Sequence, residues 1–364
     1  MLLITFHGGS SPGINNIYAY DTVTKCCLNQ SALSQPTSGP LSELRAMVVA
    51  NGYLYVANGA KATSNVLCYQ AQSSGNSFTY ISTVIGPTLS KKGHFETSIS
   101  HPFGIALNGS GTCYVSNQDT NVVAEVTLTS DGQTGSLGTC CQSAYLNKLF
   151  PAPDVFLDGT YVASQQGSLH DVDVTATSVP ASDGGLGVTL DNSGKVQNSV
   201  RDVAVANGFL FVCDEPGSAV NLYSLADGTF LGTSNALSGK PTHLEIQNGG
   251  LFVSAGSLLY WGELPPSGST APPSLSLQEV ALIPPSGNKI GGISFDNVTS
   301  PSAPTVYIPF QAGTGGADGG SIYTYTVTQS SPSTLPVLSG GTEFVASGSS
   351  TFQDTPEFVL YVAD

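Results

Sequence analysis

The chain has 364 residues, and only 10% of them are charged, whereas about 25% are charged in an ordinary globular domain. Its 25 acidic and 10 basic residues give a net charge of −15, which repels phosphate backbones and argues against nucleic acid as a partner. No apolar run approaches the roughly 18 residues of a membrane-spanning helix, so we expect no membrane segment. Gly, Ser, Thr, Val and Tyr are abundant, and residues of this kind predict an ordered all-β chain.

The first segment, Met1–Phe6, is an apolar run without the basic region of a signal peptide, and a Gly- and Ser-rich stretch follows it. We therefore interpret it as a strand. This interpretation favours a cytoplasmic protein, and secretion stays open as an alternative because a leader can be removed before such a sequence begins.

Four later segments share one pattern: an apolar run, a short turn with Asn-Gly or Gly-Ser, and a second run that contains an aromatic residue followed by Val. They are Met47–Asn58, Ile105–Asn117, Val203–Asp214 and Leu244–Ala255. Asn-Gly and related pairs suit tight hairpin turns, so each segment predicts two alternating strands joined as a β-hairpin. A strand-only motif that recurs at about 50 residues is typical of a β-propeller.

The repeat spacing predicts seven blades. The second strand of each blade is marked by one of Ile4, Tyr55, Tyr114, Tyr161, Phe211, Phe252 and Tyr307. Met1–Phe6 is then the second strand of its blade, and the C-terminal segment Pro356–Asp364 supplies the missing first strand, which closes the ring and removes exposed sheet edges. We expect residues 1–364 to form a single seven-bladed β-propeller domain, whose fourth blade, around 151–200, has the weakest pattern.

Two strand motifs carry a family resemblance. Tyr55-Val-Ala-Asn58 and Tyr114-Val-Ser-Asn117 resemble the YVTN repeat of lactonase-like seven-bladed propellers, and His101-Pro-Phe-Gly104 resembles the first strand of those repeats and of NHL repeats. The resemblance covers the second, third and fifth blades best. It implies a lactonase-like activity, since members of that group hydrolyse sugar lactones or cyclise muconates, while relatives with similar blades include lyases and binding modules.

Candidate catalytic residues follow from propeller geometry, because the first strands line the channel and the loops after the second strands open at the same face. Polar residues at the starts of the first strands are Arg45, His101, Arg201, His243 and Glu357. A guanidinium group suits a carboxylate or a developing oxyanion, an imidazole suits proton transfer, and a carboxylate orients the imidazole.

Each of these residues also has a structural interpretation. The two arginines could pair with Glu43 and Asp202 between blades, and the two histidines could hydrogen-bond to neighbouring blades. The other histidines, His7, His94 and His170, fall in loops or strand ends and receive no role.

A calcium site is a variant of the same hypothesis. Asn58, Asn117 and Asp214 end the second strands of three blades, and with Glu357 they offer the oxygen ligands that a hard cation takes. Turn-capping is the alternative use of such residues. No other cofactor is predicted.

Two classes of function remain open. The first is a hydrolase, or a cycloisomerase or lyase, that acts on a small oxygenated or carboxylate substrate at the channel mouth. The second is a non-catalytic propeller that binds a ligand or a protein. We favour the enzyme, with a small-molecule partner and a monomeric state. A carbohydrate-binding propeller is disfavoured because its blades would repeat one aromatic or acidic residue.

Overall fold

Every regular element in the described part of the chain is a β-strand. The computed structural model describes residues 1–7, 14–59, 63–86, 99, 101–118, 122–137, 156–157, 160–161, 178–179, 188–189, 200–215, 217–226, 230–268, 274–282, 288–311, 320–346 and 354–363. Within these ranges no helix is long and apolar enough to cross a membrane.

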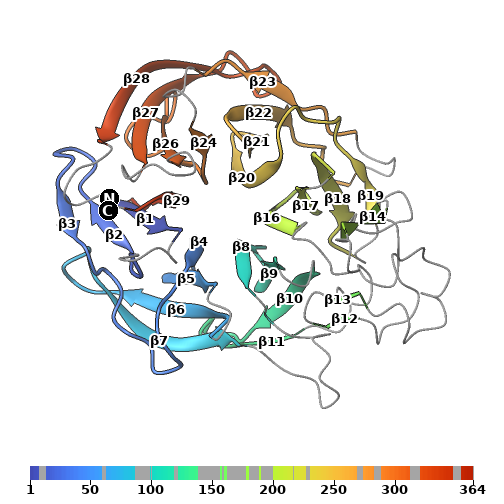
Figure 1. Ribbon diagram of the computed structural model, residues 1–364. Coiled ribbons are helices and arrows are strands. Elements are labelled where there is room, and N and C mark those ends of the chain that lie inside the picture. The colour runs from blue at the N-terminus through green and yellow to red at the C-terminus, as the bar shows by residue number, and fades with distance from the viewer. Residues whose placement is uncertain are drawn as a thin grey trace.

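Six antiparallel sheets of four or five strands stand around a central axis within the described ranges (Figure 1). The first three are β29-β1-β2-β3 (Pro356–Tyr361, Leu2–Phe6, Tyr18–Tyr20, Cys27–Asn29), β4-β5-β6-β7 (Leu44–Ala50, Tyr53–Asn58, Asn65–Ala71, Phe78–Ile85) and β8-β9-β10-β11 (Pro102–Leu107, Thr112–Asn117, Val122–Leu128, Gly135–Leu137).

The other three sheets come from the C-terminal half of the chain. They are β16-β17-β18-β19 (Val200–Ala206, Phe209–Asp214, Ala219–Ser224, Phe230–Thr233), β20-β21-β22-β23 (Pro241–Gln247, Gly250–Ala255, Leu258–Glu263, Gln278–Val280) and a five-stranded sheet in which β24 (Lys289–Ile290) and β25 (Ser294–Asp296) both pair with β26 (Thr305–Gln311), followed by β27 (Ser321–Thr328) and β28 (Val337–Val345).

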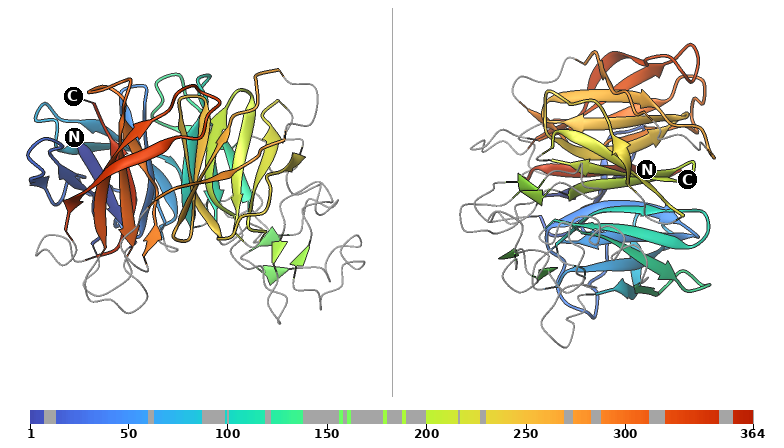
Figure 2. Two further views of the ribbon diagram at one scale, coloured as in Figure 1. Left: turned by 90° about the horizontal axis from the view of Figure 1, so that it is seen from above. Right: turned by 90° about the vertical axis from the view of Figure 1, so that its right-hand side faces the viewer.

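The first strand of each sheet lies nearest the axis, where β29, β4, β8, β16 and β20 pack side by side in that order (Figure 1). Seen from the side, the strands of the sheets run along this axis, and the two ends of the chain lie next to each other (Figure 2). The predicted pairing of the two ends is observed, because β29 pairs antiparallel with β1 and the Met1 amino group donates to the Val362 carbonyl at 2.9 Å. The chain is therefore an all-β propeller.

The predicted hairpin turns are present and have the expected backbone. The pairs Asn51-Gly52, Asn207-Gly208 and Asn248-Gly249 have φ of 55 and 79°, 54 and 84°, and 48 and 74°. Positive φ at both central residues defines the turn whose twist matches that of the flanking strands. These turns hold the registers Ala50↔Tyr53, Ala206↔Phe209 and Gln247↔Gly250.

Burial of the second strands differs from the predicted one-sided alternation. All six residues of β17 and of β21 are buried, as are five of the six in β5. Each second strand packs on both faces, because the neighbouring sheets of a propeller cover its two sides. Residues from adjacent sheets therefore share hydrophobic clusters, for example Phe211 with Leu251 and Tyr55 with Val126.

The fourth predicted blade, around 151–200, lies outside the described residues except for its last residue, Val200 in β16, and four short strands. These are the pairs β12-β13 (Phe156–Leu157, Thr160–Tyr161) and β14-β15 (Ser178–Val179, Val188–Thr189). The other six marker residues lie on β1, β5, β9, β17, β21 and β26, each the second strand of its sheet. The described part of the chain thus contains six blades, and the predicted count of seven stays a prediction.

Candidate functional site

The inner strands begin at one end of the channel, and their first residues occupy equivalent places. Leu44, Pro102 and Val200 pair with the last residues of the second strands in their sheets. Just after its first paired residue, each of the inner strands β4, β8, β16, β20 and β29 has an interruption in its register with the second strand of its sheet. β-bulges of this kind re-aim side chains and are frequent beside functional sites. The interrupted stretches carry Arg45, Phe103, Arg201, Thr242 and Glu357. We call the layer of side chains at this height the mouth.

Glu357 is the central carboxylate of the mouth. Its Oε2 lies 2.9 Å from His7 Nδ1, 3.2 Å from Gln311 Nε2 and 3.6 Å from Arg45 Nη1. Its Oε1 lies 3.6 Å from His243 Nε2. Burial alone would raise the pKa of the carboxyl, but the contacts with His243 and His7 and the charge of Arg45 outweigh it and hold the pKa well below its ordinary value. Glu357 is therefore ionised at neutral pH.

A second imidazole–carboxylate pair lies beside the first. His101 Nε2 is 3.2 Å from Glu43 Oε2, and the same oxygen is 3.5 Å from Arg45 Nη2. Both His101 and Glu43 have left-handed backbone angles, with φ of 51 and 50°. Such angles cost about 1–3 kcal/mol in a non-glycine residue, and His101 also precedes Pro102, which disfavours them further. Strain of this kind is concentrated where the backbone places a functional side chain.

Aromatic rings form the floor of the mouth. Phe103 lies between the two arginines, with the Arg45 and Arg201 guanidinium carbons 5.8 and 5.4 Å from the ring centroid. The ring also packs against His243 and Phe358, at centroid distances of 5.4 and 5.3 Å. His243 is 2% exposed, and burial, followed by the two arginine charges, lowers its pKa against the opposing effect of Glu357. Its imidazole is therefore neutral at neutral pH.

Arg201 pairs with a different carboxylate from the one the sequence suggested. Its Nε donates to Glu215 Oε2 at 2.6 Å, and among the described residues its terminal NH groups have no hydrogen-bond acceptor. Asp202, the suggested partner, instead accepts the backbone N–H groups of Val203 and Leu244 at 2.9 and 3.0 Å. The Arg201 side chain is 20% exposed, so it can present its terminal NH groups to a ligand.

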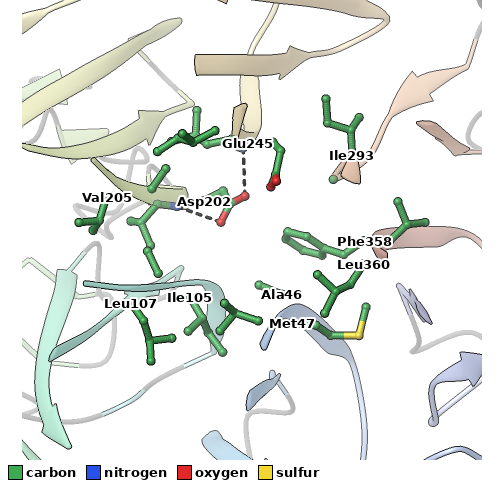
Figure 3. Close-up of a pocket in the computed structure, with 18 residues that line it drawn as sticks. Ala46, Met47, Ile105, Leu107, Asp202, Val205, Glu245, Ile293, Phe358 and Leu360 are labelled. Atoms are coloured by element: carbon green, nitrogen blue, oxygen red, sulfur yellow. Dashed lines mark hydrogen bonds between the residues drawn. The ribbon is translucent and has the colours of Figure 1, made fainter. Parts of the chain in front are cut away.

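Beneath the aromatic floor the inner strands line a cavity of about 230 Å³. Its walls are apolar except for Asp202 and Glu245, which Figure 3 shows on the same side of the space. Burial raises the pKa of Asp202 to about 7. Burial, and then the charge of Asp202, raise the pKa of Glu245 to about 8. Neither carboxyl has a cation beside it in the described part of the chain.

The three predicted metal ligands are engaged locally. Asn58 Oδ1 accepts a backbone N–H from the loop before β4 at 2.9 Å, Asn117 donates to a carbonyl of its own strand at 3.1 Å, and Asp214 accepts a turn N–H at 3.1 Å. Burial raises the pKa of Asp214 to about 6. No group of three His, Cys, Asp or Glu side chains in the described ranges is placed to hold a metal ion. The turn-capping alternative matches these contacts, and calcium binding stays a prediction.

Of the five predicted catalytic residues, the structure brings Arg45, His243 and Glu357 into one cluster and places His101 and Arg201 at its border. The sequence analysis gave no role to His7, which is a central member of that cluster. A signal for it existed, because His7 follows β1 directly. Phe6 pairs with Pro356 as Asn117 pairs with Pro102 and Asp214 with Val200, so His7 stands at the place that Gln118 and Glu215 occupy just after β9 and β17.

No protein-family model and no curated protein sequence matches the chain. A solved structure of a protein from Lactobacillus plantarum matches with a TM-score of 0.53 at 13% identity, over 93% of this chain and 81% of that one. A protein from Bacteroides uniformis, provisionally assigned as a 6-phosphogluconolactonase, matches with a TM-score of 0.48 at 12% identity, over 95% and 80%. Virginiamycin B lyase from Staphylococcus aureus matches with a TM-score of 0.39 at 10% identity, over 79% and 81%. At such identities the likeness concerns the fold alone.

Proposed function

We propose that the chain is a lactonase-like enzyme, a hydrolase or a cycloisomerase or lyase, in a seven-bladed propeller, and that it acts on a small oxygenated substrate at the mouth. The observation that carries the proposal is the Glu357 cluster, in which one buried carboxylate contacts two imidazoles and a guanidinium group. A carboxylate that orients imidazoles is the arrangement that general acid–base chemistry requires.

The charges at the mouth favour a neutral substrate. Two guanidinium groups, Arg45 and Arg201, face three carboxylates, Glu43, Glu215 and Glu357, so with neutral histidines the formal charge is −1. A substrate with several negative charges would be repelled, while a neutral lactone would not. The oxyanion that develops on the lactone accepts hydrogen bonds from the terminal NH groups of Arg201. These hydrogen bonds strengthen as the negative charge forms, so they stabilise the transition state more than the bound substrate.

Roles for the predicted residues follow from their exposure. Arg45 is 3% exposed and occupied by two carboxylates, so it positions Glu43 and Glu357 rather than contacting the substrate. His243 is equally buried and supports Glu357 from the other side. Arg201 and His101 reach the surface of the mouth, and we assign them to substrate contact.

The test is thermal unfolding and hydrolysis with a panel of neutral lactones, their hydroxy acids, small dicarboxylates and calcium. A ligand that binds only the folded protein raises Tm. We expect a neutral lactone to raise Tm and to be hydrolysed, and we expect Arg201→Gln to lose the hydrolysis while the Tm shift persists. A folded wild-type protein that neither binds nor hydrolyses any lactone would contradict the proposal. A rise in Tm with calcium would support the calcium site predicted from Asn58, Asn117 and Asp214.

A non-catalytic binding propeller is the second candidate, because Arg45 and His243 are buried together with Glu357 and both lie at ion-pair distance from it, as the members of a structural charge network do. Replacing His101 and His243 together, as His101→Gln with His243→Gln, separates the two. An enzyme loses turnover while ligand binding and the fold persist, whereas a binding module has no turnover to lose.

A further inference from the structure

The side chain of His7 is held in one orientation at the mouth. Its backbone N–H donates to the Thr355 carbonyl at 2.8 Å, which ties the end of β1 to the chain just before β29. Its Nδ1 faces Glu357 at 2.9 Å, yet 60% of the side chain is exposed. One ring edge is therefore fixed against a buried carboxylate, and the opposite edge, which carries Nε2, faces solvent.

Hydrogen bonding around Nδ1 determines the tautomer. Arg45 Nη1 lies 3.1 Å from Nδ1 and also 3.1 Å from the His7 carbonyl oxygen. A guanidinium N–H only donates and an ionised carboxylate only accepts, so Nδ1 cannot serve both neighbours. An unprotonated Nδ1 would set its lone pair against the ionised Glu357 oxygen at 2.9 Å, whereas Arg45 has the carbonyl oxygen as an acceptor, so Nδ1 carries the proton and donates to Glu357. In the neutral ring, Nε2 then keeps its lone pair.

The two other histidines in the described ranges are oriented differently. His101 directs Nε2 towards Glu43, and that atom is buried. His243 directs Nε2 towards Glu357 and is buried under the aromatic floor. His7 thus combines an oriented ring with an outward-facing Nε2, which is the arrangement of a general base.

We propose that His7 is the general base of the reaction at the mouth and that Glu357 is its positioning residue; the role in catalysis rests on the function proposed above. In lactone hydrolysis, Nε2 takes a proton from water as the water oxygen bonds to the carbonyl carbon. The ring C–O bond then breaks, its electron pair goes to the ring oxygen, and Nε2–H returns the proton to that oxygen. One water is consumed and one hydroxy acid is formed.

The tautomer can be tested without any substrate. Long-range ¹H–¹⁵N correlation spectra at about pH 8.5, where an imidazole is ordinarily neutral, report which ring nitrogen carries the proton, and His7→Gln identifies the His7 signals by their loss. We expect protonated Nδ1 and unprotonated Nε2, and we expect the Nε2-protonated form to appear in Glu357→Gln. An Nε2-protonated His7 in the wild-type protein would overturn the inference.

The catalytic role is tested by kinetics of His7→Gln on a lactone that the wild-type protein hydrolyses. A general base contributes about 10²–10⁴-fold, so we expect kcat to fall at least about 100-fold with little change in KM, and Glu279→Gln, an exposed change on β23, to leave both unchanged. Unaltered kcat in His7→Gln would overturn the inference while the proposed function stands. A wild-type protein without lactone turnover would overturn the proposed function itself. The tautomer experiment would still decide whether Glu357 orients the His7 ring, because it needs no substrate.

Discussion

Two adjacent layers of the channel contain carboxyl groups whose pKa values are shifted in opposite directions. In the mouth, Glu357 has a pKa well below its ordinary value. In the cavity layer directly beneath, the pKa of Asp202 is raised to about 7 and that of Glu245 to about 8. Glu357 and Asp202 are similarly buried, with 5% and 4% of each residue exposed, so burial does not explain the difference.

The difference lies in the partners. Glu357 has a guanidinium group and two imidazoles around it, whereas Asp202 has two backbone N–H donors and Glu245 has Asp202 as a neighbouring negative charge. Backbone donors satisfy the hydrogen-bonding capacity of a carboxylate but supply no full opposite charge. The protein thus keeps Glu357 ionised at the mouth, whereas in the layer beneath it Glu245 retains its proton at neutral pH and Asp202 is close to its titration midpoint.

Replacing Arg45, the guanidinium partner of Glu357, is expected to have the largest effect on this difference between the two layers. In Arg45→Met, Glu357 loses its guanidinium partner while it stays buried, so we expect its pKa to rise as that of Asp202 does. Breaking one partner of a buried ion pair costs about 3–5 kcal/mol, to be measured as the change in the free energy of unfolding in urea.

Arg201→Met is the matched control, because Arg201 is 20% exposed and pairs with the partly exposed Glu215. Solvent reaches this pair, so its loss is expected to cost less than that of the Arg45 contacts, towards the roughly 0–1 kcal/mol of a surface pair. Equal losses in the two variants would show that the burial of Arg45 does not decide its contribution.

A single added methyl group at Gly104 is expected to disrupt the packing of the cavity layer. A Cβ on Gly104 of β8 would lie 2.3 Å from Asp202 Oδ1 and 2.8 Å from both the Asp202 Cα and the Val203 nitrogen. Gly104→Ala therefore forces β8 and β16 apart and disturbs the hydrogen bonds of Asp202. Overpacking of this kind costs about 1–3 kcal/mol, measured again by urea unfolding. Gly109→Ala is the control, since no atom lies within 4 Å of its Cβ, and a similar loss there would contradict the packing argument.

Repetition made the fold accessible from the sequence. The Asn-Gly turns and the aromatic-Val pairs recur, and a local hairpin signal that occurs in several copies leaves few architectures that satisfy all of them. The same logic placed Arg45, Arg201 and Glu357 at equivalent heights, because they stand at equivalent places in their repeats.

Residue spacing could not settle which of these side chains meet. The mouth residues lie in stretches where the strand register is interrupted, so the period-two rule for side-chain direction does not apply to them. Arg201 accordingly pairs with Glu215 and not with its neighbour Asp202. His7 was missed because its partner, Glu357, is 350 residues away in the sequence and only the pairing of the chain ends brings them together.

The smallest and most specific effect concerns pH. The pKa of Glu245 is about 8 in the folded protein against 4.5 ordinarily, and that of Asp202 is about 7 against 3.8. Between about pH 4 and about pH 8 the unfolded chain releases these protons and the folded chain retains them, so the folded state loses stability as pH rises through this window. Glu245→Gln removes one of the two groups. We expect its Tm to equal that of the wild type near pH 4 and to exceed it by about 2 °C or more above pH 8.

Glu279→Gln supplies the matched control, because it makes the same chemical change on the exposed outer strand β23. Its Tm difference from the wild type is expected to stay constant across the same window, measured by calorimetry at each pH. If Glu245→Gln also gives a constant difference, Glu245 is ionised in the folded protein at neutral pH. Glu245 and Glu357 would then not differ in protonation, which would contradict the proposed difference between the two layers. A difference that grows with pH in Glu245→Gln alone would mean that Glu245 keeps its proton in the folded protein at neutral pH, in contrast with Glu357, which imidazoles and a guanidinium group hold in the ionised form.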